Sequence, residues 1–142
     1  MKLHEEVNIA AAGNELVEAC HGASVAAGWW MHDRRDLRLV INDPANDMER
    51  YFGGALVAQK LALIHSEVSE GLEGHRKNQM DDKLPHRPMI EVELADALIR
   101  ICDLAGAMNL DLGGAIAEKL AFNAQRADHK PENRQKAGGK AY

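Results

Sequence analysis

The sequence predicts an all-α protein, with a four-helix-bundle-like arrangement and more than one copy in the assembly. Hydrophobic residues make up 46% of the 142 residues, yet aromatic residues make up only 4%, which indicates a core of Ala, Leu and Ile side chains. Such residues suit helices. Apolar residues also recur at helical spacing in long segments. Turn signals separate these segments, as at Asn42-Asp43-Pro44 and between His75 and Pro88.

Each expected helix has its own end signals. Gly28 follows the Ala-rich first segment and ends it. Asp47 is the expected N-cap of the second helix, although the pair Gly53-Gly54 weakens its first turns. Asp111 is the expected N-cap of the fourth. The four helices are predicted at about residues 3–27, 47–75, 89–108 and 111–127.

We expect a single domain over residues 1–142, with its core at about residues 3–127. Residues 128–142 form a basic tail that contains prolines and glycines. Chain ends of this kind are usually frayed extensions. The alternative is a lid over a charged substrate, because Gly138 and Gly139 precede Lys140.

The composition argues against several classes of protein. A formal net charge of −5 offers no overall attraction to nucleic acid or to membranes. Cys20 and Cys102 have neither metal-ligand spacing nor a disulfide pattern, so a reducing, cytoplasmic location is expected. We expect no membrane span and no signal peptide, because the sequence contains no apolar run of about 18 residues and its first ten residues contain no apolar signal segment.

Two acidic pairs are the strongest functional signal. Glu67 and Glu70 are three residues apart within the second expected helix, and Glu93 and Asp96 have the same spacing in the third. Residues three apart share a helix face, so two packed helices would bring four carboxylates together. Four hard oxygen donors would suit Mg²⁺ or Mn²⁺. The alternative is that both pairs belong to solvated faces.

The third helix carries its polar residues in one narrow stripe. Glu93, Asp96, Arg100 and Asp103 interrupt a segment that is otherwise apolar almost all round. This stripe is either a thin solvent-facing edge or an acidic groove in which Arg100 is an internal counter-charge. Helical periodicity does not decide between these two interpretations.

The second helix has apolar residues on two faces. Its best apolar stripe lies opposite Glu67 and Glu70 on a helical wheel, which favours solvent exposure of both carboxylates. Leu56 and Leu63, however, share the side of the carboxylates, so we expect this helix to pack on both faces. The stripe consists of Leu61, Ile64, Val68 and Leu72.

A face of the fourth helix changes from apolar to polar along its length, in the order Leu112, Ile116, Lys119, Asn123 and Arg126. Two cations and an amide near four carboxylates would suit a metal-bound polyphosphate. The alternative is that the long basic side chains merely flank a core stripe.

Together these motifs resemble those of the MazG-like nucleoside triphosphate pyrophosphohydrolases, an all-α family related to dimeric dUTPases and dCTP pyrophosphatases. The segments LALIHSEVSEGLEGHRK and EVELADALIRICDLAG are similar to those of the short, single-domain MazG-like proteins of bacteria and phages. The resemblance covers about residues 48–142 and is weaker before them. It rests on the two acidic pairs followed by the basic helix.

The resemblance implies an enzyme that cleaves a ribo- or deoxyribonucleoside triphosphate between its α and β phosphates. The products would be a nucleoside monophosphate and pyrophosphate. The implied Mg²⁺ ligands, for which Mn²⁺ would substitute as the ion, are Glu67, Glu70, Glu93 and Asp96. The implied phosphate-binding residues are Lys119, Asn123 and Arg126. Glu67 or Glu70 is the candidate catalytic base.

Trp29 and Trp30 are aromatic residues that could stack on the nucleobase of the substrate, and Trp30 is the candidate for this contact. The alternative is that they anchor the core or an interface. Self-association into a dimer or tetramer is expected, because one helix is apolar nearly all round and another on two faces. The resemblance implies the same.

Three other functions are consistent with parts of the sequence. A phosphoribosyl-ATP pyrophosphohydrolase would share the helices and the acidic motifs. A di-iron bundle needs Glu-x-x-His on two helices, and only Glu18-x-x-His21 fits. A helical binding or assembly module would leave the acidic stripes as solvated faces.

Overall fold

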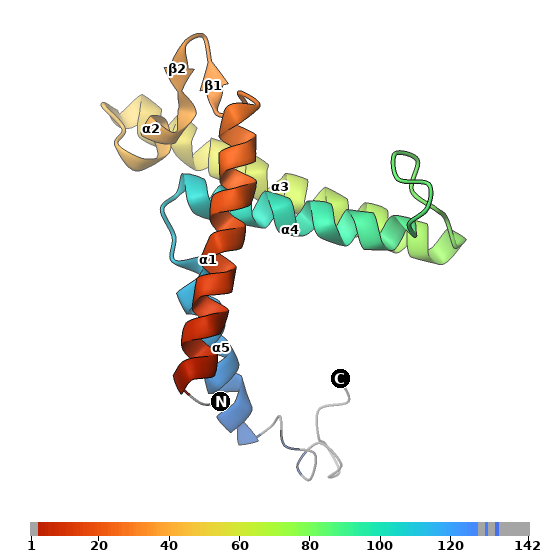
Figure 1. Ribbon diagram of the computed structural model, residues 1–142. Coiled ribbons are helices and arrows are strands. Elements are labelled where there is room, and N and C mark those ends of the chain that lie inside the picture. The colour runs from red at the N-terminus through yellow and green to blue at the C-terminus, as the bar shows by residue number, and fades with distance from the viewer. Residues whose placement is uncertain (1–2, 128–129, 131–132, 134–142) are drawn as a thin grey trace. The chain divides into compact units, whose positions relative to one another are not determined.

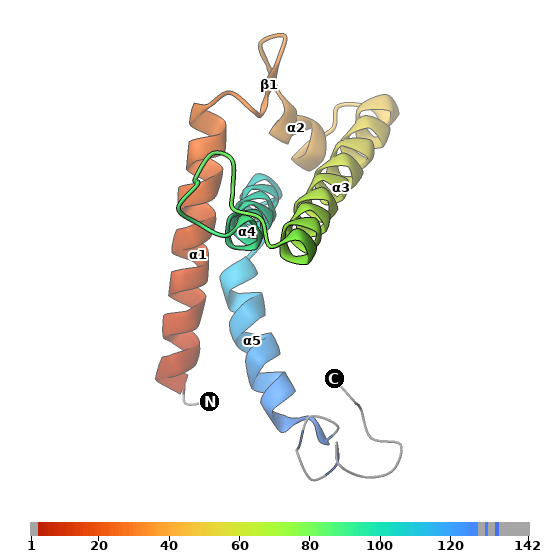
Figure 2. The same cartoon turned by 90° about the vertical axis from the view of Figure 1, so that its right-hand side faces the viewer.

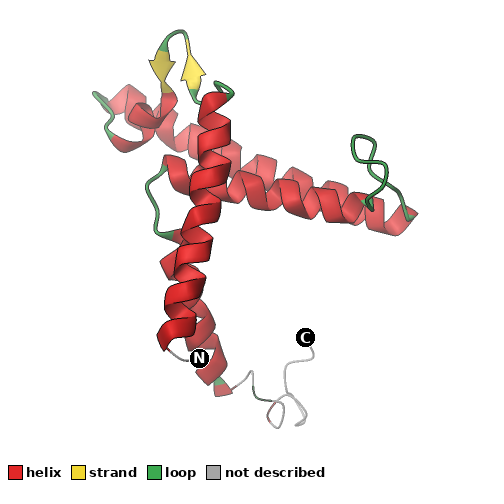
Figure 3. Ribbon diagram, in the orientation of Figure 1, coloured by secondary structure: helices red, strands yellow, loops and turns green. Residues whose placement is uncertain are grey.

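The computed structural model describes residues 3–127, 130 and 133, and most of them are helical (Figure 3). Within these residues, five helices and one two-stranded hairpin follow one another along the chain (Figure 1). They are α1 (Leu3–Ala26), β1 (Met31–His32), β2 (Arg35–Asp36), α2 (Leu37–Asn42), α3 (Asp47–Lys77), α4 (Met89–Ala107) and α5 (Leu112–Gln125). The all-α prediction is confirmed at this level.

The segment after α1 is more structured than the sequence suggested. Residues Asp33 and Arg34 both have positive φ and turn the chain between β1 and β2, which pair antiparallel. Asp36 then caps the short helix α2, because its side chain accepts a hydrogen bond of 2.9 Å from the backbone N–H of Arg38. This six-residue helix adds a fifth to the four that were predicted.

Helix α3 begins and ends at well-capped positions. The N-cap is Asn46 rather than the predicted Asp47, because the Asn46 side chain accepts a hydrogen bond of 2.9 Å from the N–H of Glu49. Asn78 closes the other end in the left-handed conformation. The helix therefore continues two residues past the predicted end at His75.

Gly53 lies inside α3 because α2 packs closely there. A Cβ atom at this position would lie 2.6 Å from the carbonyl oxygen of Val40. The contact between α2 and α3 therefore requires a glycine at position 53, although glycine is unfavourable inside a helix. Close packing of the two helices offsets the conformational free energy that a helical glycine costs.

The chain divides into two compact units, one formed by residues 1–15 and 111–142 and the other by residues 16–110. In the second unit α3 and α4 run side by side in opposite directions, as Figures 1 and 2 show. A buried cluster fills its core, made of Trp30, Leu56, Leu104 and Ala107. The carboxylates of interest all belong to this second unit.

In the first unit, α5 lies beside the first part of α1 (Figure 2). The Asn14 side chain donates a hydrogen bond of 2.9 Å to Asp111 and accepts one of 2.9 Å from the N–H of Gly113. Asp111 also accepts from the N–H of Gly114, so its predicted role as N-cap is confirmed. The suggested lid of residues 128–142 lies outside the described residues, apart from 130 and 133.

Large apolar side chains remain exposed on α3 and α4. They include Leu61, Val68, Leu72, Leu94 and Leu98, which are each between 45% and 59% exposed. Among the described residues, none of the helices has both the length and the apolar character that crossing a membrane requires.

Candidate functional site

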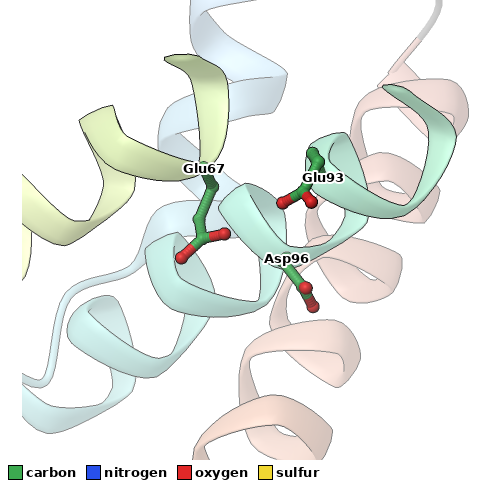
Figure 4. Close-up of side chains that lie close together, drawn as sticks. All are labelled: Glu67, Glu93 and Asp96. Carbon is green, nitrogen blue, oxygen red and sulfur yellow. The ribbon is translucent and has the colours of Figure 1, made fainter. Parts of the chain in front are cut away.

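Three carboxylates converge where α3 and α4 lie side by side. Glu67 comes from α3, whereas Glu93 and Asp96 come from α4, as Figure 4 shows. One carboxylate oxygen of each residue lies within 4.8 Å of those of the other two. Glu67 and Glu93 are buried and Asp96 is exposed. We call these three residues the acidic cluster.

Glu70, the fourth predicted ligand, lies at the edge of the acidic cluster. It is exposed and is not among the three carboxylates that meet most closely. Its negative charge nevertheless contributes to raising the pKa of Glu93. Glu70 is therefore close enough to interact with the cluster electrostatically.

Small residues bring α3 and α4 close together at this point. Gly71 is buried, and a Cβ atom added to it would lie 3.3 Å from the Cβ of Glu93. That distance is shorter than an ordinary van der Waals contact between carbon atoms. The absence of a side chain at Gly71 thus allows Glu93 to lie between the two helices and to approach Glu67.

Arg100 neutralises part of the negative charge of the cluster. Its Nε donates a hydrogen bond of 2.6 Å to Oε1 of Glu67. The Arg100 side chain is 43% exposed, whereas that of Glu67 is only 9% exposed. A charged, short hydrogen bond of this kind stabilises the buried carboxylate. Arg100 is therefore the internal counter-charge that the acidic-groove interpretation required.

Burial and the neighbouring carboxylates change the protonation of Glu93. Burial is the largest cause that raises the pKa of this carboxyl group, to about 7. A hydrogen bond with Glu67 and the charges of Glu70, Glu67 and Asp96 are the smaller causes of the same rise. Between about pH 4.5 and 7, Glu93 therefore keeps a proton that an ordinary glutamate would lose.

The structure decides which faces of the two helices are buried. On α4, Glu93 and Asp103 are each only 7% exposed, whereas Asp96 and Arg100 are exposed, so the polar stripe is buried at Glu93 and Asp103 and open to solvent between them. On α3, the buried face contains Glu67, Gly71 and Leu56. The predicted apolar stripe of α3 is mostly exposed in this chain, and the helical-wheel indication that Glu67 faces solvent was wrong.

The donor set fits a hard divalent cation. Carboxylate oxygens are the protein ligands that Mg²⁺ and Mn²⁺ prefer. The pKa of Glu93 is raised chiefly by burial and also by the neighbouring carboxylates. A cation held by Glu67, Glu93 and Asp96 would balance that charge and displace the proton.

Comparisons of this chain with protein-family models, with curated proteins and with solved structures found no match.

The predicted phosphate-binding residues belong to the other unit. Lys119 lies on α5, with its Nζ 4.9 Å from the ring centroid of Phe122. Asn123 is half-buried, and its Oδ1 has no hydrogen-bond partner within the described part of the chain. Arg126 is the C-cap residue of α5. The convergence of these three residues with the acidic cluster stays a prediction.

The two tryptophans have different environments. Trp30 is 1% exposed, and its Nε1 donates a hydrogen bond of 2.7 Å to Asp103. Trp30 is therefore a core anchor, and no face of its ring is open to a nucleobase in this conformation. Trp29 is 71% exposed and lines a cavity next to Asp96. Trp29 replaces Trp30 as the aromatic residue available to a ligand.

Two polar residues beside this cavity were not singled out as site residues from the sequence. Lys60 lies two turns before Glu67 on α3, and Asp103 lies two turns after Asp96 on α4. Helical spacing of seven residues was the available signal. His21, from the single Glu-x-x-His motif, lies 2.9 Å from Asp103 through Nδ1, whereas Glu18 is exposed.

Proposed function

We propose that this protein hydrolyses ribo- or deoxyribonucleoside triphosphates between the α and β phosphates with the help of Mg²⁺ or Mn²⁺. The observation that carries the proposal is the acidic cluster of Glu67, Glu93 and Asp96 at one side of a cavity with both charged and apolar lining residues. Asp96 belongs to both features. A ligand whose phosphates met the acidic cluster through a cation would therefore extend into the cavity.

The positive charges beside the acidic cluster favour a phosphate ligand bound through a cation over a site that binds a cation alone. Arg100 lines the cavity and borders the acidic cluster through its hydrogen bond with Glu67. Lys60 lines the same cavity. Guanidinium and ammonium groups beside carboxylates are the combination that a metal-bound polyphosphate requires. Lys119, Asn123 and Arg126 are proposed as further phosphate ligands.

In the proposed reaction the carboxylates hold the cation, and one of them also accepts a proton. Glu67, Glu70, Glu93 and Asp96 would hold the cation, which supplies neutralisation of phosphate charge and acidification of the attacking water. Glu67 or Glu70 would accept the proton as the water oxygen attacks phosphorus. The phosphoanhydride bond then breaks, and the nucleoside monophosphate and pyrophosphate leave. Arg100 would orient a phosphate oxygen as charge moves to the leaving group.

The test is pyrophosphate release from a panel of ribo- and deoxyribonucleoside triphosphates with Mg²⁺ or Mn²⁺. Wild type is compared with Glu70→Gln and Asp96→Asn, which remove one negative charge each with little change in shape. Loss of a metal-ligating or proton-accepting carboxylate should lower kcat/KM by about 100-fold or more. The matched control is Glu91→Gln, because Glu91 is an exposed acid on α4 that pairs with Arg87 outside the cluster.

Melting experiments separate the proposal from its alternatives. Mg²⁺ or Mn²⁺ should raise the Tm of wild type and of Glu91→Gln but not that of Asp96→Asn. Cation-dependent stabilisation without release from any ordinary nucleotide would favour phosphoribosyl-ATP as the substrate. Neither stabilisation nor release would favour a binding or assembly module and would overturn the proposal.

Self-association belongs to the proposal as well. Several large apolar residues of α3 and α4 are exposed, and contiguous apolar surface of this kind is often covered by a partner. A second copy that covered this surface would explain why α3 has apolar residues opposite Glu67.

A further inference from the structure

A cavity of about 470 Å³ in the second unit adjoins the acidic cluster. The end of α1, the segment after it, α3 and α4 contribute its walls. Its polar lining residues are Ser24, Lys60, Asp96, Arg100 and Asp103. The cavity is thus polar at the cluster and polar again at Asp103, two helical turns further along α4.

Asp103 is a buried lining residue of this cavity, with neighbours on three sides of its carboxylate. Its Oδ1 accepts a hydrogen bond of 2.7 Å from Trp30 Nε1 and lies 2.9 Å from His21 Nδ1. These two partners come from the segment after α1 and from α1 itself. Oδ2, the second oxygen, lies 3.9 Å from Lys60 Nζ. Because Oδ1 already has two neighbours, Oδ2 is the acceptor available to a ligand.

Lys60 is equally well positioned. Its side chain is 19% exposed, and Nζ lies 4.2 Å from the centroid of the Trp30 ring. The cation–π contact and the charge of Asp103 hold the ammonium group in place. At 3.9 Å the pair is too far apart for a hydrogen bond, so both groups keep hydrogen-bonding capacity towards the cavity.

The remaining wall suits a flat ring. Trp29 lines the cavity and is 71% exposed, and Leu63 and Ile99 add apolar surface. Aromatic rings and apolar side chains bind the faces of nucleobases, whereas charged groups bind their edges. A cavity with both features, next to a candidate phosphate site, has the layout of a nucleotide-binding cleft.

We infer that Lys60 and Asp103 read the edge of the nucleobase and select bases with a lactam edge, meaning a carbonyl beside a ring N–H. Guanine, hypoxanthine, uracil and thymine present this edge. This inference rests on the proposed function, because it takes the cavity next to the acidic cluster to hold the nucleoside.

Hydrogen-bond direction gives the reason for the choice. Lys60 only donates and Asp103 as a carboxylate only accepts. A lactam edge supplies a carbonyl oxygen for Lys60 Nζ and a ring N–H for Asp103 Oδ2. Adenine and cytosine present the reverse pattern at this edge, an amino donor beside a ring nitrogen that only accepts, which would face Lys60 with a donor and Asp103 with an acceptor. Both bonds would be charge-assisted.

The experiment uses pairs of nucleoside triphosphates that differ in this edge, with the full chain and Mg²⁺. The pairs are guanine against 2-aminopurine, which lacks O6 and the ring N–H, and uracil against cytosine. Pyrophosphate release and binding by equilibrium dialysis are both measured. We expect the lactam member to be preferred by at least about tenfold in each pair, because a site that hydrogen-bonds a polar group rejects an analogue without it.

Three variants test the residues themselves. Asp103→Asn keeps an acceptor for Trp30 and places an amide at the cavity, and Lys60→Met keeps the apolar stem over the Trp30 ring. In both variants the discrimination within each pair should fall to about threefold or less. The matched control is Lys77→Met, a lysine on α3 that pairs with Glu73 outside the cavity, and it should keep the wild-type discrimination. Melting curves establish that each variant is folded.

The possible outcomes are distinct. Three results would overturn the assignment. Wild type could bind both members of each pair equally, or could prefer 2-aminopurine and cytosine. The third is discrimination that is unchanged in both cavity variants. Preferential binding of the lactam members without pyrophosphate release would support the assignment and overturn the proposed hydrolysis alone. Release with no base preference would support the hydrolysis and overturn the assignment.

Discussion

Arg100 reaches from α4 to the buried carboxylate of Glu67 on α3, with 2.6 Å between its Nε and Oε1. This contact joins the two helices at the acidic cluster. It also leaves the rest of the Arg100 side chain partly exposed and beside the cavity. One residue therefore compensates charge within the cluster and offers positive charge to a ligand.

Arg100→Met should destabilise the protein by about 1–2 kcal/mol in the absence of divalent cations. The reason is that Glu67 would remain buried beside Glu93 without a counter-charge. Chemical unfolding in the presence of a chelator measures the effect. Arg87→Met is the control, because Arg87 forms an exposed ion pair with Glu91 and should change stability by less than about 0.5 kcal/mol. Equal effects of the two substitutions would contradict the role given to Arg100.

Glu93 should make stability depend on pH. Its pKa is raised from 4.5 to about 7 in the folded protein, chiefly by burial. Between these two values the folded state binds the proton more tightly than the unfolded state does. Its contribution to stability is therefore complete below about pH 4.5 and is lost as the pH rises through about 7.

The measurement is the Tm of chelator-treated protein across this range. Glu93→Gln should flatten the dependence between about pH 5 and 7.5 and should be more stable than wild type at pH 8, where the wild-type carboxylate is charged and buried. Glu91→Gln should keep the wild-type slope. A slope that is the same in Glu93→Gln and wild type would show that another group is responsible.

Local sequence signals were sufficient for the long helices. The N-cap at Asp111 depends on residues within one turn, and the sequence contains all of them. By contrast, α2 and the hairpin are short and are stabilised by contacts with distant residues, as the approach of Gly53 to Val40 illustrates. The sequences of such short elements give little indication of their structure, because short helices and strands depend on tertiary packing for their stability.

The site was predictable in its spacing but not in its orientation. The spacing of Glu93 and Asp96 places both carboxylates on one face of α4. Which face of α3 is buried depends on what packs against it, and here Gly71 lies inside while the more apolar Leu72 lies outside. The pairing of Lys60 with Asp103 joins residues on two helices, which a one-dimensional pattern does not connect.

The exposure of Leu72 and its apolar neighbours predicts self-association. Light scattering at micromolar concentration should give a mass of at least two chains, because the exposed apolar surface of α3 and α4 would be covered by another copy. Leu72→Lys should shift the protein towards the monomer, whereas Gln59→Lys, also at an exposed position of α3, should not. A monomeric mass for wild type would contradict the prediction.

The contact of Gly71 with Glu93 predicts unequal effects of alanine at two glycines of α3. Alanine in place of an exposed helical glycine usually stabilises a protein by about 0.5–1 kcal/mol. Gly54→Ala should show this gain, because a Cβ at Gly54 meets nothing within 4 Å. At Gly71 the Cβ would lie 3.3 Å from that of Glu93, so α3 and α4 must move apart by a few tenths of an ångström.

Gly71→Ala should therefore be at least about 1 kcal/mol less stable than Gly54→Ala, as measured by chemical unfolding. It should also lower the gain in Tm that Mn²⁺ produces, because the oxygens of Glu67 and Glu93 would be further apart. Gly54→Ala should leave that gain unchanged. If both alanine variants were equally stabilised and responded equally to Mn²⁺, then close packing at Gly71 would not be what positions the acidic cluster.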